Sequence, residues 1–526
     1  MSYKPLQIDN KPQMAASLTT MAEKGVNLRT APQLLDVSQS LNCKNYEIED
    51  ASNLVKRLGL TSVFDSGTEK ITMFKQWTSD IWIIGYGTTV SYYQKSTSTL
   101  ATIKTDFSAN DSFSGARYGD YFFVCNGVDK IWYIEVTDLT TITQIAASQA
   151  TASTLSVIGP RLYAGVDTDT YYSEIDDGSD PPFQTWTNGT LATDGGKVSA
   201  RNAGDVQSIV PLGADVVVFS DKGFYAFEIT VFDSAGTTSK SEKITNYVED
   251  FGGSRGAIST EKGIFYANEA GLWNLVSIGQ TYVPFSRQYQ PVSYLLGNDY
   301  FDDVNTDNGD IYYDQKKRVV YFTCGKGSDT NNLVIAYQTE YKAFYFISGW
   351  NISRFVNDDG TMYGASDAKT AVYTLFNGYT DDGLIIGTDY KQEITMGNPE
   401  LRKKLLGVYT QGFLSLSSLV KVRFDIYNEK GVKTTDKVKY NWTAQYSTGS
   451  GDGYDSAIYS SSVYGGDLDD NKLVECFDGA RPFIANFQRV RLHITSADEY
   501  PHALTWVKLE TKLKSKARVR TLSKTT

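Results

Sequence analysis

The feature of this sequence that most restricts its fold is the return of short, aromatic-rich segments at regular intervals. Between about Ile71 and Asn377, stretches of about five to seven residues alternate apolar and polar side chains and come in hairpin groups. Such alternation is typical of β-strands, and pairs such as Asn126-Gly127 and Asn308-Gly309 favour tight turns between them. The groups recur about every 40 to 50 residues, which is the blade spacing of a β-propeller. The pattern therefore predicts an all-β chain whose middle part is a propeller of six or seven blades.

Both ends of the chain depart from this pattern. The N-terminal region has few alternating segments, whereas the segments after Asn377 are longer and are interrupted by a Gly-, Ser-, Asp- and Tyr-rich loop. A chain of 526 residues also exceeds the size at which a single hydrophobic core stops growing. We therefore expect four parts: an extended N-terminal arm at 1–65, the propeller at 66–380 with a long inserted loop at about 231–255, an antiparallel β-sandwich-like domain at 381–515, and a basic tail at 516–526.

The cysteines and the hydropathy of the chain exclude several classes of protein. Cys43, Cys125, Cys324 and Cys476 are far apart and form no Cys-x-x-Cys pair, so we expect buried free thiols rather than a zinc or redox site. No apolar run approaches the roughly 18 to 20 residues of a membrane helix. Residues 1–10 lack the apolar core of a signal peptide. We therefore expect a soluble chain without a membrane anchor or a leader.

The net charge of the chain is −11, which argues against a surface that clamps nucleic acid, because affinity for a phosphate backbone comes from clustered Lys and Arg. An acidic surface would instead let DNA pass without binding it. The end of the chain differs, since the segment from Pro501 to Thr526 has seven basic residues and one acidic residue. This segment is either a solvated tail or a tether onto an acidic partner subunit or onto DNA. The residues predicted to make such partner contacts are Lys512, Lys514, Lys516, Arg518 and Arg520.

The sequence offers no catalytic constellation, and we predict that the chain is not an enzyme and uses no cofactor. Propeller glycosidases need two carboxylates at the axial mouth, but 61 Asp and Glu residues make that criterion unselective here. The repeated Ser-x-Asp turns of sialidase-like propellers have one imperfect counterpart, Ser220-Asp221-Lys222-Gly223, which an ordinary hairpin turn explains better. His493 and His502 are the only histidines, and we expect both to be structural. The sequence also lacks a Gly-rich phosphate loop that ends in Lys-Ser or Lys-Thr.

The best candidate for a metal site lies between positions 303 and 310. Asp303, Asn305 and Asp307 place oxygen ligands at alternate positions, as a calcium-binding loop does. The stretch departs from the EF-hand pattern because glycine is at its seventh place rather than its sixth, and Asp314 stands where the closing glutamate belongs. We therefore favour a turn at Asn308-Gly309 over a calcium site.

Aromatic residues in the C-terminal loop suggest a different class of function. Tyr454, Tyr459 and Tyr464 recur at intervals of five residues among Gly and Ser, where they could stack on a sugar or dock a partner protein. Tyr454 and Tyr459 are therefore further candidates for partner contact. They keep open an alternative function, that of a propeller carbohydrate-binding protein or glycoside hydrolase.

Several segments, taken in order, resemble one family of viral proteins. Near the N-terminus, Gly25-Val26-Asn27-Leu28-Arg29 is followed by Pro32 and then by Lys56-Arg57-Leu58-Gly59-Leu60. Three internal stretches add to the likeness: Ser112–Val128, which ends in an apolar strand and Asn-Gly; Val157–Trp186, with an Arg-Leu-aromatic strand followed by Tyr-Ser and Trp; and Val210–Phe227, a strand pair before a long loop. In this order they resemble the tail nozzle and packaged-DNA stabilisation (head-closure) proteins of short-tailed bacteriophages.

This resemblance implies a structural protein of the virion. It implies a ring of identical subunits, expected to be a homohexamer, that lies below the portal and adaptor proteins and contacts other tail proteins. The ring would retain the packaged genome and form the channel for its ejection, and DNA would pass through the lumen without sequence-specific binding. The expected localisation is the phage tail, after assembly in the host cytoplasm.

Overall fold

The computed structural model describes most of the chain, and its residues divide into two compact units. The described residues are 14–20, 24–36, 38–49, 53–108, 112–148, 151–176, 178, 180–234, 237–249, 252–253, 256–278, 281–284, 291–395, 403–415, 417–428, 433, 438–443, 474–480 and 484–513. Unit 1 comprises Met1–Gly59, Gln338–Ile347 and Gly378–Thr526, and unit 2 comprises Leu60–Tyr337 and Ser348–Asn377. No helix within these described ranges is long and apolar enough to span a membrane.

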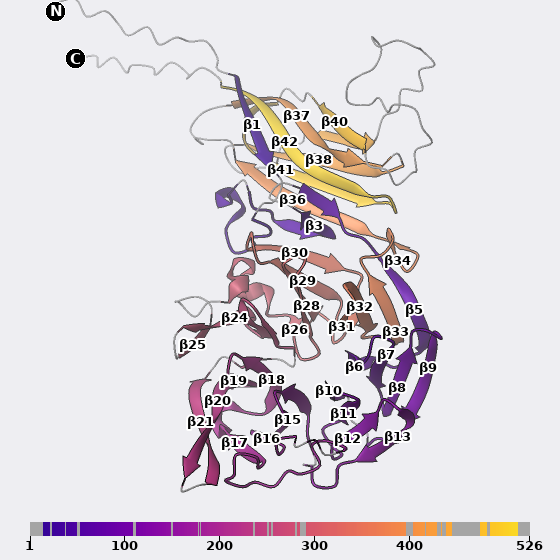
Figure 1. Ribbon diagram of the computed structural model, residues 1–526. Coiled ribbons are helices and arrows are strands. Elements are labelled where there is room, and N and C mark those ends of the chain that lie inside the picture. The colour runs from indigo at the N-terminus through magenta and orange to yellow at the C-terminus, as the bar shows by residue number, and fades with distance from the viewer. Residues whose placement is uncertain are drawn as a thin grey trace, which may run out of the picture. The chain divides into compact units, whose positions relative to one another are not determined.

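Unit 2 is a seven-bladed β-propeller whose blades are antiparallel sheets (Figure 1). Blades one to three are β6–β9 (Ile71–Gln76, Ile81–Tyr86, Thr89–Gln94, Thr99–Lys104), β10–β13 (Ser114–Tyr118, Tyr121–Cys125, Trp132–Glu135, Asp138–Gln144) and β14–β17 (Thr154–Ile158, Arg161–Val166, Asp169–Tyr172, Gly196–Ser199). Blades four and five are β18–β21 (Val206–Leu212, Asp215–Ser220, Gly223–Ser234, Thr237–Glu249) and β22–β25 (Ile258–Thr260, Gly263–Asn268, Gly271–Ile278, Thr281–Pro284). Blade six contains β27–β29 (Ile311–Asp314, Val319–Lys326, Leu333–Gln338) with β26 (Val304–Asn305) beside β28. Blade seven consists of β31–β33 (Ile352–Asp358, Thr361–Ser366, Thr370–Leu375) and β5 (Leu60–Gly67).

The seven blades close into a ring. Their first strands, β6, β10, β14, β18, β22, β27 and β31, contact one another in cyclic order, and β31 contacts β6. The fourth strand of the last blade is β5, which precedes the first blade in the sequence and pairs Phe64 with Val372 and Leu60 with Leu375. The propeller therefore begins at Leu60 rather than at residue 66, because the segment that we assigned to the arm completes the last blade.

Hydroxyl side chains at the start of the first strands join neighbouring blades. The Thr72 hydroxyl accepts a hydrogen bond from the Phe113 backbone N–H over 3.2 Å, and the Ser114 hydroxyl accepts one from the Leu155 N–H over 3.0 Å. At the closing seam the Ser353 hydroxyl donates to a backbone carbonyl of blade one over 2.5 Å. These links satisfy backbone groups that apolar packing between the blades would otherwise leave buried without partners.

The segment expected to be a long loop at 231–255 is instead mostly β-structure, so that prediction is wrong. Strands β20 and β21 form one long hairpin in which Gly223 pairs with Glu249 and Ser234 pairs with Thr237. The outer part of strand β20 is exposed on both faces, as Val231 and Phe232 illustrate. A strand without a buried face lacks the apolar alternation by which strands are recognised, and its polar composition therefore resembles that of a loop.

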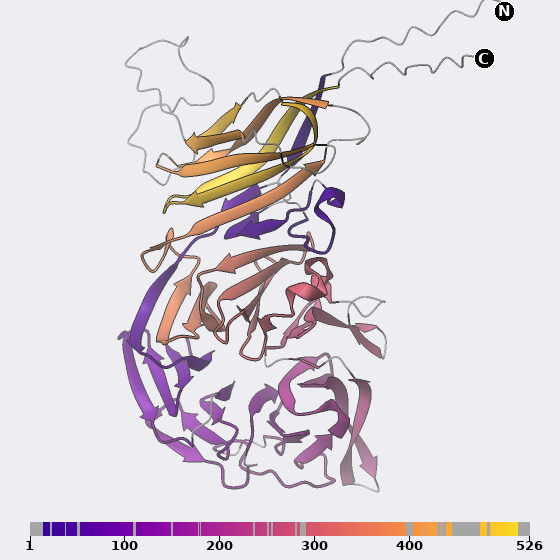
Figure 2. The ribbon, with the colours of Figure 1, turned by 180° about the vertical axis from the view of Figure 1, so that it is seen from behind.

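Unit 1 is an antiparallel β-sandwich, as expected for the C-terminal part. One layer has the strand order β2–β36–β41–β38–β39 (Asn42–Lys44, Gly387–Thr395, Ile484–Ala497, Leu419–Asn428, Val438–Thr443). The other layer has β40, β37 and β42 (Val474–Ala480, Lys403–Leu414, His502–Leu513), and β42 also pairs with β1 (Met14–Thr20) and β4 (Asn53–Lys56), beside which lies β3 (Tyr46–Glu49). Figure 2 shows this unit from behind, with β42 in yellow and β36 in orange.

The two layers of the sandwich share an apolar core. Val490, Leu492 and Ile494 of β41 are completely buried, and the residues between them lie on the other face of their layer. Trp442 of β39 reaches the second layer, since a Cβ atom on Gly412 would lie 2.8 Å from its ring. The all-β class, the propeller and the C-terminal sandwich are thus confirmed.

The N-terminal segment is extended, and its strands are integral to the sandwich. Strand β1 pairs with β42 from Met14↔Lys512 to Thr20↔Trp506, and β2 pairs with β36. The residues that we expected to form an arm thus contribute to both layers, because the sandwich edges leave backbone groups that these short strands satisfy.

Candidate functional site: a buried polar network in the sandwich

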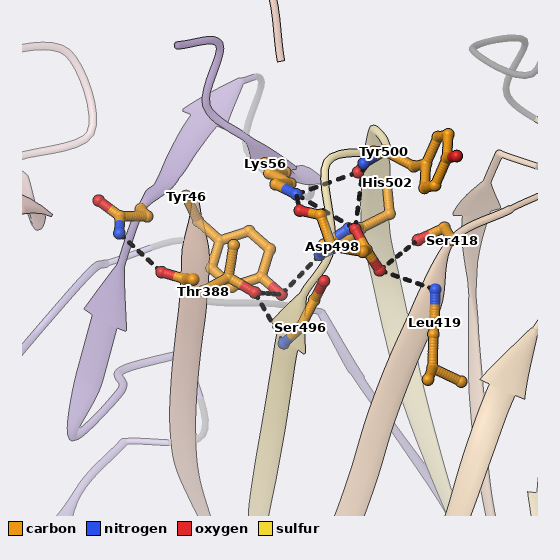
Figure 3. A network of polar contacts seen from close by, with 11 residues as sticks. Tyr46, Lys56, Thr388, Ser418, Leu419, Ser496, Asp498, Tyr500 and His502 are labelled. Atoms are coloured by element: carbon orange, nitrogen blue, oxygen red, sulfur yellow. Dashed lines mark hydrogen bonds and ion pairs between the residues drawn. The ribbon is translucent and has the colours of Figure 1, made fainter. Parts of the chain in front are cut away.

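A buried cluster of polar and titratable side chains in unit 1 lies between its two layers (Figure 3). Five residues form it: Tyr46 on β3, Lys56 on β4, Thr388 on β36, Asp498 in the turn after β41, and His502 on β42. We call these five residues the Lys56–His502 network. Its members come from both ends of the chain, so it exists only in the folded sandwich.

A chain of hydrogen bonds runs through the network in one direction. The Ser496 backbone N–H donates to the Thr388 hydroxyl over 3.1 Å, and that hydroxyl donates to the Tyr46 oxygen over 3.1 Å. The Tyr46 hydroxyl is 2.9 Å from Nε2 of His502. With both upstream donors fixed, the Tyr46 O–H is left to donate to Nε2, which must then be unprotonated. The geometry therefore selects the neutral form of His502.

The electrostatics of the site agree with this assignment. Burial, and secondly the nearby Lys56 charge, lower the pKa of His502 to about 3, and the side chain is completely buried. Burial also raises the pKa of Tyr46. Both side chains are consequently neutral near pH 7, and neither is accessible to a substrate.

Lys56 and Asp498 form the charged part of the network. Nζ of Lys56 is 3.2 Å from Oδ1 of Asp498 and 3.2 Å from the Tyr500 carbonyl, and it also donates to the Asp498 carbonyl. Three acceptors therefore saturate the ammonium group, whose side chain is only 1% exposed. Burial opposes ionisation of Asp498, but the hydrogen bond from the Leu419 N–H and the Lys56 charge outweigh it and hold its pKa below the ordinary value.

A second buried ion pair follows directly in the sequence. The Arg57 guanidinium makes two hydrogen bonds to the Asp381 carboxylate, over 2.8 and 2.5 Å, and a third, over 3.0 Å, to the Asn45 side chain. Arg57 is 1% exposed, and such a bidentate pair fixes the orientation of both side chains. The end of β4 is thus held by two buried ion pairs, one from Lys56 to Asp498 and one from Arg57 to Asp381.

Two glycines allow the N-terminal segment to approach its neighbours closely. A Cβ atom on Gly59 would lie 1.8 Å from the Thr380 carbonyl oxygen. Gly25 has a φ of +66°, and a Cβ atom there would lie 2.4 Å from the Phe344 backbone nitrogen. Any other residue at either position would displace the backbone.

Taken together, these contacts hold a segment in place and do not form a reaction centre. The Tyr46 and His502 side chains are fully buried, and each Lys56 N–H has a protein acceptor. The sequence gives no link between His502 and Lys56, which come together only in the folded sandwich. The only signal was the Lys-Arg-Leu-Gly-Leu motif itself.

The candidate calcium residues lie in a loop with its own internal partners. Asp303 forms an ion pair with Lys326, and the Asn305 side-chain oxygen accepts the Asp307 backbone N–H over 2.9 Å. The ammonium group already neutralises Asp303, and Asn305 closes a local turn. Within the described ranges, no three His, Cys, Asp or Glu residues are placed to hold a metal ion.

The predicted partner-contact residues fall largely outside the described part of the chain. Tyr454 and Tyr459 lie outside it, as do Lys514, Lys516, Arg518 and Arg520, and Lys512 is the penultimate residue of β42 with an undescribed side chain. The cysteine prediction is confirmed for Cys43, Cys125 and Cys324, which are buried and free, whereas the side chain of Cys476 is not described.

Comparisons with known proteins identify no family for this chain. No protein-family model matches the chain, and no curated protein matches it. Among solved structures, a chain from the crystal structure of a mitotic checkpoint complex is 10% identical, with a TM-score of 0.39, and the match covers 61% of this chain and 94% of that one.

Proposed function

We propose that this chain is a structural subunit of a bacteriophage tail nozzle or head-closure ring. The ring retains the packaged genome and forms the channel for its ejection. Six copies close it, next to portal, adaptor and other tail proteins, and DNA passes through the lumen without sequence-specific binding. In this role the propeller is a rigid scaffold, and the protein acts by its shape and charge in the virion.

The observation that carries the proposal is the place of the family-like residues in the fold. In the N-terminal motifs, Lys56 and Arg57 form buried ion pairs, and Gly25 and Gly59 stand where a Cβ atom would collide with backbone. Asn27 is buried and holds its own loop through hydrogen bonds of 3.0 and 2.9 Å. The likeness to the nozzle family thus rests on residues that specify a fold rather than on composition.

The internal family-like stretch at Val157–Trp186 behaves in the same way. The guanidinium of Arg161 donates to the carbonyl oxygens of Ser173, Asp194 and Ala192, over 2.6, 2.7 and 2.6 Å. These bonds fix the long connection that follows β16, and the Trp186 indole N–H is bonded within that connection. The arginine and the tryptophan of this stretch therefore have a structural reason.

The charge of the propeller is compatible with a scaffold that DNA passes without binding. Unit 2 contains 21 Lys and Arg residues but 36 Asp and Glu residues. A surface of this charge repels the phosphate backbone of DNA. It also has few cations that could displace the counterions bound to DNA.

Electron microscopy of the purified protein and composition analysis of virions test the proposal. Negative-stain images of the full chain should contain rings with sixfold symmetry, and mass spectrometry should find the chain in purified particles of the phage that encodes it. Particles assembled without it should package DNA but lose it. A monomer that is absent from particles would refute the proposal.

A further inference from the structure

One face of the sandwich carries an unusual set of charges for an acidic protein. It is the outer face of the layer β2–β36–β41–β38–β39, opposite the apolar core. Residues that pair directly across neighbouring strands share a face, so the register identifies its members. The cations on it are Lys44, Lys391, Lys421, Arg423, Lys433, Lys439, Arg489 and Arg491. We call this set the basic face.

Three carboxylates share the basic face with these eight cations in the described strands. Glu393 is paired with Arg489 over 2.9 Å and with Arg491 over 2.8 Å, and its side chain is completely buried. Both guanidinium groups also lie over the ring of Tyr427, at 4.3 and 5.2 Å from its centroid. One buried negative charge is thus shared by two arginines, which leaves one positive charge at the surface.

The other two carboxylates follow a similar arrangement. Asp425 is 4% exposed and lies 3.4 Å from Nε of Arg423 and 2.7 Å from Nζ of Lys433. Asp389 is 3.0 Å from Nζ of Lys391 and accepts further hydrogen bonds. The acids hold the cations in fixed positions without neutralising them, and the face has a net charge of +5.

The cations of this face are available to a partner. The side chains of Arg423, Lys433 and Lys391 are 39%, 37% and 36% exposed, and Lys421 and Lys439 are exposed as well. Fixed cations lose little side-chain entropy on binding, which favours recognition of an acidic surface.

The two units differ in net charge. Unit 1 has 29 Lys and Arg against 25 Asp and Glu, a net charge of +4, whereas the propeller has a net charge of −15. The propeller also has an acidic edge at blades two and three. There the Tyr118 hydroxyl donates to Asp176 over 2.9 Å, Tyr121 bonds Asp180, and Glu135 pairs with Tyr121 across the sheet.

We propose that the basic face docks on the acidic propeller of a second copy of this chain. The contact joins two different surfaces, and such heterologous contacts close into a ring when the rotation between copies permits it. The inference rests on the proposed ring and names the surfaces that hold it together. Charge complementarity of this kind sets orientation and weakens as salt screens it.

Charge reversal on the full chain tests the contact. In Lys421→Glu/Lys439→Glu both changes are on exposed positions of the basic face, and the matched control Lys222→Glu/Lys316→Glu makes the same charge change on exposed propeller positions. Mass photometry over a range of protein concentrations, at 50 and 500 mM NaCl, measures assembly. The face variant should associate about tenfold more weakly or worse than the wild type, the control should assemble normally, and high salt should weaken the wild type.

Each other outcome overturns the inference. If the face variant still forms rings, the basic face is not the contact, although the proposed nozzle role stands. If the wild type is monomeric at every concentration, both the inference and the ring fail. Binding of the wild type and the face variant to a DNA duplex, measured by fluorescence anisotropy under the same conditions, tests DNA as the alternative partner. If the face variant loses affinity for DNA but still assembles, the basic face binds nucleic acid and not a second copy.

Discussion

The hydroxyl of Tyr46 and Nε2 of His502 share a hydrogen bond of 2.9 Å although the two residues are 456 positions apart in the sequence. This bond joins the first and last parts of the chain inside the sandwich. Because neither side chain has access to water, the bond cannot be replaced by solvation when one partner is removed. The contact is therefore a sensitive point at which to test the structure of unit 1.

Tyr46→Phe is expected to destabilise unit 1 by about 1 to 3 kcal/mol, since it leaves the Thr388 hydroxyl and Nε2 of His502 buried without their shared partner. Hydrogen exchange of backbone amides, measured on peptides from β3 and β42, should become faster by the factor that corresponds to this loss of stability. The control is Tyr294→Phe, at an exposed tyrosine of the propeller. Unchanged exchange in β3 and β42 would show that the hydrogen bond contributes nothing.

Acid is expected to destabilise unit 1 through His502. Its pKa is about 3 in the folded state, whereas the ordinary value in an unfolded chain is 6.5. Between these values the unfolded state binds one more proton than the folded state. Stability is therefore fully present above about pH 6.5 and falls by about 1.4 kcal/mol per pH unit as the pH decreases toward 3.

Denaturant unfolding from pH 7.5 to pH 4.5 measures this dependence. His502→Gln should be less stable at pH 7.5 but should lose the part of the slope that belongs to His502. Tyr294→Phe, at an exposed tyrosine of the propeller, changes no histidine and should keep the wild-type slope. Equal slopes in His502→Gln and the wild type would contradict the assignment of His502 as a buried neutral side chain.

Gly59→Ala should destabilise the chain by about 1 to 3 kcal/mol, because the new methyl group would overlap the Thr380 carbonyl, which is 1.8 Å from the Cβ position. Gly387→Ala is a matched control, since the nearest atom to its Cβ position is 3.9 Å away. Thermal unfolding of the two variants side by side measures the difference. If both alanines are tolerated equally, the close approach at Gly59 is not a constraint.

The seam between blades seven and one depends on Asp358. Its carboxylate accepts hydrogen bonds from Gln76 over 2.7 Å and from the Trp82 indole over 2.8 Å, and it also pairs with Lys95 over 2.5 Å. Asp358→Asn presents an N–H group to these donors, so a loss of about 2 to 4 kcal/mol is expected.

Tryptophan fluorescence during thermal unfolding should detect the opened seam through Trp82, with a lower midpoint for Asp358→Asn. The adjacent Asp359→Asn substitution is at an exposed turn position and should leave the midpoint within about 1 °C of the wild type. Equal midpoints for the two variants would mean that the carboxylate does not hold the ring closed.

Several parts of the fold follow directly from local patterns. Ile81–Tyr86 and Tyr121–Cys125, for example, are short apolar, aromatic-rich runs bounded by turn residues, which is the pattern of strands buried on both faces, and nearly all of their residues are buried. The number of blades does not follow in this way, because the last blade takes β5 from a segment that precedes the first one. The outer part of β20 lacks a buried face, so its sequence resembles that of a loop although it pairs with β21.

For the buried polar site in the sandwich, the sequence shows only the Lys-Arg-Leu-Gly-Leu motif and not the partners of its residues. Lys56, Arg57 and Gly59 stand together in the sequence, but their partners Asp498, Asp381 and Thr380 are more than 300 positions away. Nothing local identifies which of 61 acidic residues pairs with which cation.

The all-β class, the repeated unit and the excess of acid follow from the chain alone, because strand period, turn residues and charge are local or additive properties. Tertiary structure alone decided that seven blades close the ring, that the N-terminal segment becomes part of the sandwich, and that eight cations gather on one face. These depend on strand pairing between distant segments, since register determines which side chains share a face and the chain order does not encode register.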